Sequence, residues 1–439
     1  MAMHNWPFLG RTQPLVVAGG SGSYLIQPDG SKILDAAGGA IVVNIGHGRP
    51  EVAETIAKAT RNGGYVVPTW MTPEREELVE ELTNHWLPTH LSRIHLTSGG
   101  SEANEAAMKI AVQYFAARGK PKKSMILSRS VSYHGTTITT AGVSGHASRK
   151  RGLEAILGQY SSIETPYPLR CPLGQHHPDA ADYYIENLQA VIDAEGHENI
   201  AALIAEPLNG SSGGAIAPPE NYWPRAAQIL KENDILLIMD EVMTGFGRIG
   251  QRFGSEFYQL EPDLLVAGKG MASGYAAIAG CYGTEEIAAT IADSPFEVMF
   301  HTFGALPVSC AAATSVLQIL RQESLLTKCQ QRGQELKQYL IDEFGQHPHI
   351  AEIRGEGLLL GIEIVKDRES LGRFAETDHI TNKLVSQALQ SGVFFYPGGT
   401  GEYRDILCIG APFIIADKEI ELMGTALKSA LDHCFGDLT

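Results

Sequence analysis

Residues 201–242 read AALIAEPLNGSSGGAIAPPENYWPRAAQILKENDILLIMDEV, and this stretch decides the fold. It contains two short apolar runs, 201–205 and 235–239, of the kind that favours β-strands. Between them lie a glycine-rich loop and, at 223–232, a helical pattern. A strand, a helix and a second strand at this spacing form the βαβ unit of a parallel sheet.

The same alternation continues on both sides of this stretch. The further apolar runs are 93–97 (RIHLT), 124–128 (SMILS) and 264–267 (LLVA), and the further helical patterns are 102–117, 181–194 and 310–321. We therefore predict an α/β fold in which a large domain, residues 65–325, contains a doubly wound and mainly parallel sheet.

The two ends of the chain have a different pattern. Residues 20–46 are typical of short strands and turns, and residues 351–365 are typical of two strands. Helices are expected at 325–344, 379–390 and 418–435, with a further strand at 406–409. We therefore predict a smaller α+β domain built from both termini, with its N-terminal part at 1–64 and its C-terminal part at 326–439.

The composition excludes several classes of protein. Of the 439 residues, 44% are hydrophobic and 19% are charged, which argues against a disordered or coiled-coil chain. The net charge of −16 disfavours nucleic acid and anionic membranes as partners. No apolar stretch approaches the ~18 residues of a membrane span, and no signal peptide is expected. Six scattered cysteines without CxxC pairs favour reduced thiols and a cytoplasmic protein.

Ligands of an open parallel sheet bind beyond the carboxyl ends of its strands, so the residues after each apolar run are the candidates for a site. The run 93–97 is followed by SGGSEANE (98–105), in which Gly100 and Ser101 open a helix. Backbone N–H groups and the helix dipole can hold an anion there, which indicates a phosphate site. An ordinary turn with Ser101 as the helix N-cap is the alternative.

Three side chains follow the next runs. Tyr133 comes after 124–128 and could stack on a planar ligand, although a packing role is the alternative. Glu206 directly follows 201–205 and is either the wall of a site or a solvated loop acid. Asp240 directly follows 235–239, where a carboxylate at the end of a buried strand needs a cation or a hydrogen-bond donor.

Lys269 stands between two glycines after the run 264–267. Such a lysine has room to form a Schiff base, and burial would lower its pKa; an ordinary lysine that reaches solvent is the alternative. A phosphate turn, an aromatic ring, an acid and an isolated lysine together suit pyridoxal 5′-phosphate (PLP). The turn would hold the phosphate, Tyr133 would stack on the ring, and Asp240 would keep the pyridine nitrogen protonated.

Two other motifs are interpreted as structural. Residues 245–250 (GFGRIG) match the dinucleotide pattern GxGxxG, but no convincing helix follows and no acid ends a second strand about 20 residues on. A nucleotide-dependent dehydrogenase is therefore only an alternative function, from a different class of enzyme. His176 and His177 lie near Cys171 in a proline-rich loop whose spacing matches no zinc pattern, so no metal site is expected.

Taken together, these motifs resemble the class III, PLP-dependent aminotransferases of fold type I, including their ω-transaminase members. The resemblance covers nearly the whole chain in the right order. It rests on SGGSEANEAAMKIA (98–111), SYHGTT (132–137), IAEPLNGSSGG (204–214), DEVMTGFGRIG (240–250), PDLLVAGKGMASGY (262–275), HTFGALP (301–307), RGEGLLLGIEI (354–364) and APF (411–413).

The resemblance implies a role for each matched residue. Lys269 would be the Schiff-base lysine and the base that moves protons between substrate and cofactor. Asp240 would pair with the pyridine nitrogen, and Tyr133 and Val242 would sandwich the ring.

The same resemblance implies the remaining contacts. Gly100 and Ser101 would hold the phosphate, and Glu206 would line the substrate side of the site. Thr302 would reach the phosphate of the neighbouring subunit, so the resemblance implies a homodimer with active sites at its interface.

The sequence departs from the family pattern in two places. Family members that bind an α-carboxylate use an Arg three residues before a Pro-Pro pair, where this chain has Cys408. A neutral Cys cannot form that bidentate pair, and the nearest substitute is Arg404, for which we hypothesise a mobile carboxylate-binding role. The second departure is Leu306, where many relatives have a Gly-Asn-Pro run.

Trp70 is expected either to line the donor pocket or to belong to the core.

The expected function is transfer of an amino group from an amine or ω-amino acid donor to a keto acid, with pyruvate as the expected acceptor, by a ping-pong cycle. A PLP-dependent racemase or aminomutase of the same fold is the alternative within the cofactor class, and a non-catalytic relative is a third possibility.

Overall fold

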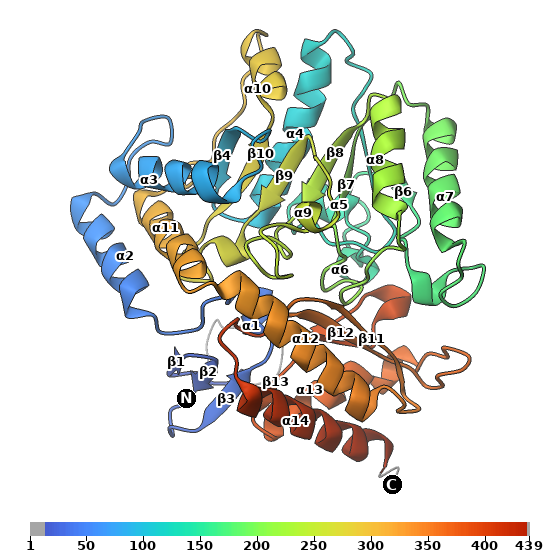
Figure 1. The fold of residues 1–439 in the computed structure, drawn as a ribbon. Helices are drawn as coiled ribbons and strands as arrows, with labels where there is room; N and C mark the ends of the chain where they lie inside the picture. Colours follow the sequence, from blue (N-terminus) through green and yellow to red (C-terminus); the bar gives the residue numbers. More distant parts are fainter. Residues whose placement is uncertain (1–13, 437–439) are drawn as a thin grey trace.

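The computed structural model describes residues 14–436 and is built around a seven-stranded sheet (Figure 1). The strand order is β4-β10-β9-β8-β7-β5-β6. The strands are β4 (Arg93–Thr97), β5 (Met125–Arg129), β6 (Ser162–Ile163), β7 (Ile200–Ala205), β8 (Leu236–Asp240), β9 (Leu264–Ala267) and β10 (Ala279–Gly283). The pairs from β9 to β6 are parallel and β10 is antiparallel to both of its neighbours, which confirms the predicted mainly parallel sheet.

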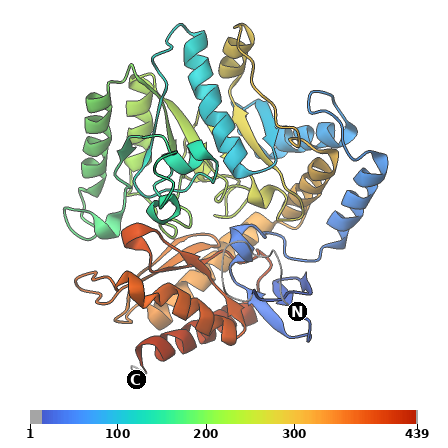
Figure 2. The same cartoon turned by 180° about the vertical axis from the view of Figure 1, so that it is seen from behind.

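Helices cover both faces of this sheet. In β7, Ala202 and Ile204 belong to a core shared with α4 (Gly100–Ala117), whereas Leu203 and Ala205 belong to a core on the other face. That second core is covered by α7 (Ala180–Glu195) and α8 (Tyr222–Glu232). Figure 2 shows the sheet from behind, where α4 comes to the front. Because successive side chains of a strand point to opposite faces, an unbroken apolar run is what a strand buried on both sides requires.

Strand β10 was not predicted. Its sequence, AGCYG, contains two glycines and no β-branched residue, so it carries no periodic signal. It lies between β4 and β9 and is antiparallel to both, and β4 therefore points in the same direction as β9. As a result, the carboxyl end of β4 lies at the same edge of the sheet as the carboxyl ends of β5, β7, β8 and β9.

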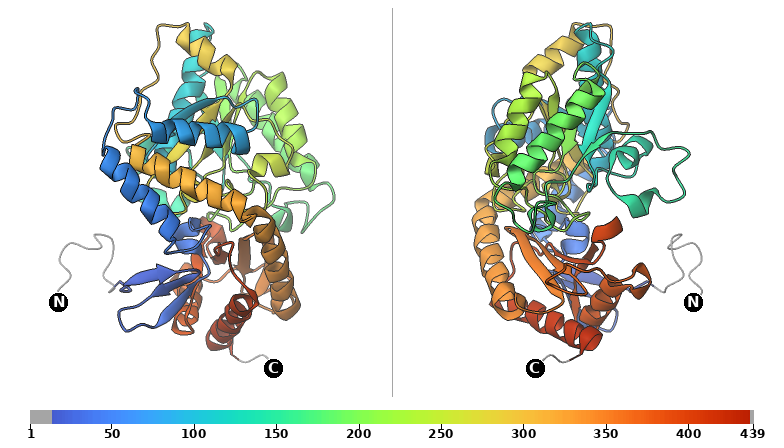
Figure 3. Two further views of the ribbon diagram at one scale, coloured as in Figure 1. Left: turned by 60° about the vertical axis from the view of Figure 1, so that its left-hand side comes forward. Right: turned by 90° about the vertical axis from the view of Figure 1, so that its right-hand side faces the viewer.

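A smaller part of the molecule contains two four-stranded sheets (Figure 3). One is antiparallel, in the order β11-β12-β15-β14, and comprises β11 (Ile350–Glu356), β12 (Leu359–Ile364), β14 (Tyr396–Gly398) and β15 (Ile406–Ile409). The other has the order β1-β2-β3-β13 and comprises β1 (Gly19–Ser21), β2 (Tyr24–Ile26), β3 (Lys32–Asp35) and β13 (Val393–Phe394). The parallel pair β3–β13 joins the two ends of the chain, as expected for a domain built from both termini.

The helices at the boundary link the two parts. Helix α11 (Pro307–Gln322) packs against α2 (Pro50–Asn62). It is followed by α12 (Leu325–Phe344), and Ser324, the residue before α12, has a φ of 52°. The smaller part also contains α13 (Ile380–Gln390) and α14 (Asp417–Phe435). We propose that the large domain spans residues 65–325 and that residues 1–64 and 326–439 form the smaller one. No helix within residues 14–436 is long and apolar enough to cross a membrane.

Candidate active site

A cavity of about 160 Å³ lies at the carboxyl ends of the central strands. Its walls include these residues expected from the sequence: Gly100, Ser101, Tyr133, Glu206, Asp240, Val242 and Lys269. They come from the start of α4, from the last residue of β8 and from the loops after β5, β7, β8 and β9. Because these strands share one direction, they bring together residues that are far apart in the sequence, from Gly100 to Lys269.

Asp240 is the most firmly held side chain of the cavity. It is 3% exposed, and its Oδ2 atom accepts a hydrogen bond from Asn104 Nδ2 at 2.8 Å. The same oxygen lies 2.8 Å from His134 Nδ1, while Oδ1 accepts the Val242 N–H at 3.0 Å. Because an ionised carboxylate only accepts, we assign the ring proton of His134 to Nδ1. Three neighbouring donors therefore fix the position of this carboxylate.

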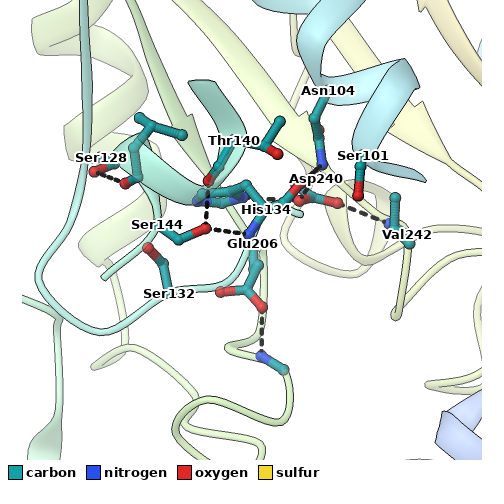
Figure 4. A network of polar contacts seen from close by, with 12 residues as sticks. Ser101, Asn104, Ser128, Ser132, His134, Thr140, Ser144, Glu206, Asp240 and Val242 are labelled. Atoms are coloured by element: carbon teal, nitrogen blue, oxygen red, sulfur yellow. Dashed lines mark hydrogen bonds and ion pairs between the residues drawn. The ribbon is translucent and has the colours of Figure 1, made fainter. Parts of the chain in front are cut away.

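His134 and Asn104 were not predicted as site residues. Figure 4 shows both side chains directed at Asp240, and the backbone N–H of His134 donates to Ser144 Oγ at 2.8 Å. His134 Nε2 and Asn104 Oδ1 are buried without a hydrogen-bond partner. His134 stands next to Tyr133 in the SYHGTT segment, which could have marked it as a site residue. Nothing in that segment shows that its ring points toward Asp240, which is 106 positions away.

Helix α4 begins at Gly100, with Gly99 in the N-cap position and no side-chain cap. The alternative that Ser101 is the N-cap is therefore wrong, since Ser101 lies in the first turn and its Oγ accepts the Thr136 N–H at 3.1 Å. A Cβ atom at position 100 would lie 2.8 Å from Val242 Cγ1, so the glycine lets the helix start against Val242. An uncapped helix start beside a cavity is suited to an anion.

Lys269 enters the cavity from a strained position. It follows β9 with a φ of 42°, in the left-handed region that non-glycine residues rarely adopt. Its amine has no hydrogen-bond or ion-pair partner within the described part of the chain. Burial lowers the pKa of Lys269 to about 8, although the negative charges of Asp240 and Glu206 oppose this shift. A lysine with this pKa is a usable nucleophile and base near neutral pH.

Glu206 is a buried acid on another wall. It is 5% exposed, its Oε1 accepts the Gly210 N–H at 2.8 Å, and its Oε2 accepts from Asn209 Nδ2 at 3.1 Å. Burial raises the pKa of Glu206 to about 7, against the opposing effect of His134, and the charge of Asp240 raises it further. The alternative of a solvated loop acid is therefore wrong.

Three predicted residues do not line the cavity. Trp70 is 68% exposed, so a core role for it is excluded, and Thr302 lies on an exposed loop. Arg404 donates to the carbonyl oxygens of Phe374 at 2.6 Å and Gly401 at 3.1 Å, and would have to break both bonds to reach the cavity.

The two motifs interpreted as structural lie outside the cavity. Residues 245–250 form turns rather than the start of a helix, and the buried Arg248 donates to the Ala411 carbonyl at 2.7 Å. His176 Nε2 lies 3.4 Å from a carboxylate oxygen of Glu352. Within residues 14–436, no three His, Cys, Asp or Glu side chains are grouped to hold a metal ion.

Comparison with known proteins identifies the class that this fold and site define. The family model "Aminotransferase class-III" matches residues 9–431. The aminotransferase YodT of Bacillus subtilis is 35% identical over 413 residues, which is 92% of each chain. The putrescine–pyruvate aminotransferase of Pseudomonas aeruginosa is 32% identical and covers 95% of this chain and 89% of its own.

A solved structure agrees over the whole fold. The (S)-enantioselective ω-transaminase of Thermomicrobium roseum superimposes with a TM-score of 0.92 at 32% identity, over 98% of this chain and 96% of its own. The chain therefore belongs to the class III aminotransferases. It is a PLP-dependent transaminase of fold type I.

Proposed function

We propose that this enzyme transfers an amino group from an amine or ω-amino acid donor to a keto acid, with pyruvate as acceptor. The observation that carries the proposal is Cys408 in β15, which is buried and whose thiol has its pKa raised to about 12 by burial. Cys408 does not line the cavity itself, and a neutral thiol at this position cannot pair with an α-carboxylate, so we propose a donor that carries none. The likeness to a putrescine–pyruvate aminotransferase supports the same assignment.

The cavity fits PLP because it combines an uncapped helix start, a buried acid within hydrogen-bond distance of three donors, and an unpaired lysine. We propose that Gly100 and Ser101 hold the phosphate, that Tyr133 and Val242 flank the ring, that Asp240 holds the proton on the pyridine nitrogen, and that Lys269 holds the aldehyde end. When bound, PLP supplies an electron-withdrawing ring that stabilises negative charge on the donor carbon.

The side chains of this chain would then handle the protons. Lys269 Nζ removes the proton from the amine-bearing carbon of the donor, and in the second half of the cycle it returns one to the acceptor carbon. Its lowered pKa keeps a useful fraction of the amine neutral at neutral pH. Asp240, held by Asn104 and His134, keeps the proton on the pyridine nitrogen. Glu206 lines the substrate side as a second buried acid.

Capture of PLP by the apoprotein should depend on pH through Lys269. The ammonium form cannot attack an aldehyde, so the rate should rise as pH increases through about 8 and then level off. An unperturbed lysine would instead keep gaining rate up to ~10.4. Stopped-flow absorbance after PLP is mixed with apoprotein at pH 6–10 measures this profile. A midpoint above pH 9.5 would show that burial does not lower this pKa.

A half-reaction tests the proposed function. A primary amine without any carboxylate should convert the bound cofactor to its pyridoxamine form in the absence of keto acid, and pyruvate should then restore the original spectrum. A racemase or aminomutase would return to its starting spectrum with the amine alone. Conversion by α-amino acids only would show that the donor site requires an α-carboxylate and would contradict the proposal.

We further propose a homodimer in which Thr302 of each chain reaches the phosphate in the other chain's cavity. The loop around Thr302 exposes Phe303 to 61%, and Phe303 contacts Tyr65 edge-on with ring centroids 6.4 Å apart. The exposed Trp70 lies on the same N-terminal loop as Tyr65, and we propose that it lines the donor pocket once the partner covers this surface. The free cysteines, five of which are buried, support a cytoplasmic location.

A further inference from the structure

Arg129, the last residue of β5, is a buried cation that pairs with no carboxylate in the described part of the chain. It is 1% exposed, and its Nη1 atom donates to the carbonyl oxygen of Glu206 at 2.9 Å. Its Nε and Nη2 atoms are buried without a hydrogen-bond partner among residues 14–436. Burying a charge without a counter-ion is costly, so the presence of this arginine needs a reason.

Two aromatic rings stand beside Arg129 where an acid would be expected. Its guanidinium carbon lies 4.5 Å from the ring centroid of Trp223 and 5.7 Å from that of Tyr222. Both rings belong to the start of α8 and are buried. The face of an aromatic ring attracts a cation, and the attraction is larger where water is excluded. This contact therefore ties the end of β5 to the start of α8.

Arg129 and Trp223 hold two successive peptide groups after β7. Arg129 donates to the carbonyl of Glu206, and the indole N–H of Trp223 donates to the next carbonyl, that of Pro207, at 2.9 Å. Glu206 is the member of this pair whose side chain lines the cavity (Figure 4). Two buried donors thus fix the backbone from which the Glu206 side chain enters the cavity.

The carboxyl group of Glu206 also feels the charge of Arg129. Burial is the main cause of the raised pKa of Glu206, and the charge of Asp240, at the end of β8, adds to it. His134, in the loop after β5, and Arg129 act in the opposite direction. The negative charge of Glu206 in turn raises the pKa of Lys269, against the larger effect of burial. A change at Arg129 should therefore reach Lys269 through Glu206.

We propose that Arg129 is a positioning residue, which fixes the peptide between Glu206 and Pro207 and supplies the positive charge that keeps the Glu206 carboxyl group in place in the cavity that Lys269 enters. The proposal rests on the proposed function and assigns Arg129 no contact with substrate or cofactor. The alternative is a structural role in which Arg129 only attaches α8 to the sheet.

The first measurement is the pH profile of PLP capture by the apoprotein. Arg129→Met keeps the length of the side chain and removes its charge. The pKa of Glu206 should then rise, less of its negative charge should remain at neutral pH, and the pKa of Lys269 should fall. The midpoint of the capture profile should move to lower pH by ~0.5 or more. Glu206→Gln removes the same negative charge directly and should move the midpoint in the same direction.

The second measurement asks whether the two residues act as one unit. Arg129→Met and Glu206→Gln should each lower the rate of the half-reaction with a primary amine about tenfold, because small displacements at a reacting centre are costly. The double variant should be no slower than the slower single variant, since both changes act through one carboxyl group. Arg129→Lys should recover part of the rate and of the midpoint because it keeps the charge.

Further variants separate the anchoring of the backbone from the charge. Trp223→Phe keeps a ring beside Arg129 and removes the donor to Pro207, so it should lower the rate about threefold and leave the capture midpoint near that of the wild type. Arg225→Gln is the matched control and should behave as wild type, because Arg225 lies two residues after Trp223 and pairs on the surface with Asp182 at 2.5 Å.

Arg129→Gln is a second uncharged variant, whose amide can still donate to the Glu206 carbonyl. Three results would overturn the proposal. An unchanged capture midpoint in a folded uncharged variant would show that the charge of Arg129 does not reach Glu206. Losses of rate that multiply in the double variant would show that the two residues act independently. Failure of both Arg129→Met and Arg129→Gln to fold would show the structural role.

The outcome for the proposed function is read separately. If the wild type captures PLP and no amine converts it to the pyridoxamine form, the proposed function fails. The capture profiles of the Arg129 and Glu206 variants would still decide whether Arg129 acts on Glu206, because PLP capture by the apoprotein requires no amine donor.

Discussion

Replacing Lys269 by alanine is expected to lower the rate of transamination by about 10⁴-fold, which is the largest effect of any single substitution at this site. The residue combines two proposed roles: its amine holds the aldehyde end of PLP, and it moves the proton at the substrate carbon. Because Lys269 has no ion-pair or hydrogen-bond partner in the described residues, its removal should leave the fold intact. The half-reaction rate and the thermal midpoint measure these two expectations.

Borohydride reduction gives an independent readout for Lys269. The wild type should retain PLP covalently on the peptide that contains Lys269, and Lys269→Ala should not. Lys231→Ala, on the exposed end of α8, is a control that should behave as wild type. Labelling at another lysine, or a variant that keeps a tenth of the wild-type rate, would show that Lys269 does not hold the cofactor.

Replacing Asp240 by asparagine should lower the rate by about 10²- to 10³-fold, which is the usual size of the loss when one electrostatic group is removed from a reacting centre. The amide is nearly isosteric but carries no charge, so it cannot keep the pyridine nitrogen protonated. It would also present an N–H group where the carboxylate accepts from Asn104 and His134, each at 2.8 Å.

Two measurements show whether Asp240→Asn loses rate only because the carboxylate charge is gone, and not because the cofactor no longer binds. The variant should still bind PLP through Lys269 and should lose rate in both half-reactions. Asp234→Asn is the matched control, because Asp234 pairs with Lys120 at 2.6 Å on the surface. A variant with half of the wild-type rate would exclude Asp240 as the partner of the pyridine nitrogen.

The buried parallel strands could be predicted because their requirement is local. A strand covered on both faces is apolar along most of its length, and β7 and β9 are apolar throughout, while β5 and β8 become polar only at their carboxyl ends. Strand β10 has no such signal, since its place between β4 and β9 depends on pairing with strands that are far away in the sequence. Similarly, nothing local predicts that β13 pairs with β3.

The candidate site divides in the same way. Asp240 and Lys269 could be predicted because each is a charged residue at the end of an apolar run, where burying a charge is costly unless it has a partner or a function. His134 and Asn104 could not, because their role depends on the direction in which their side chains point.

By itself, the sequence indicated the class of enzyme through its resemblance to a family, and its apolar runs and strand-end residues located the parallel strands and the loops that would carry the chemistry, since these are properties of short segments. Only the tertiary structure decided that Asn104 and His134 hold Asp240, and that Arg404 donates to two carbonyl oxygens away from the cavity. The physical reason is that a hydrogen bond or a stacking contact depends on distance and direction between side chains, and these are set when strands and loops remote in the sequence pack together.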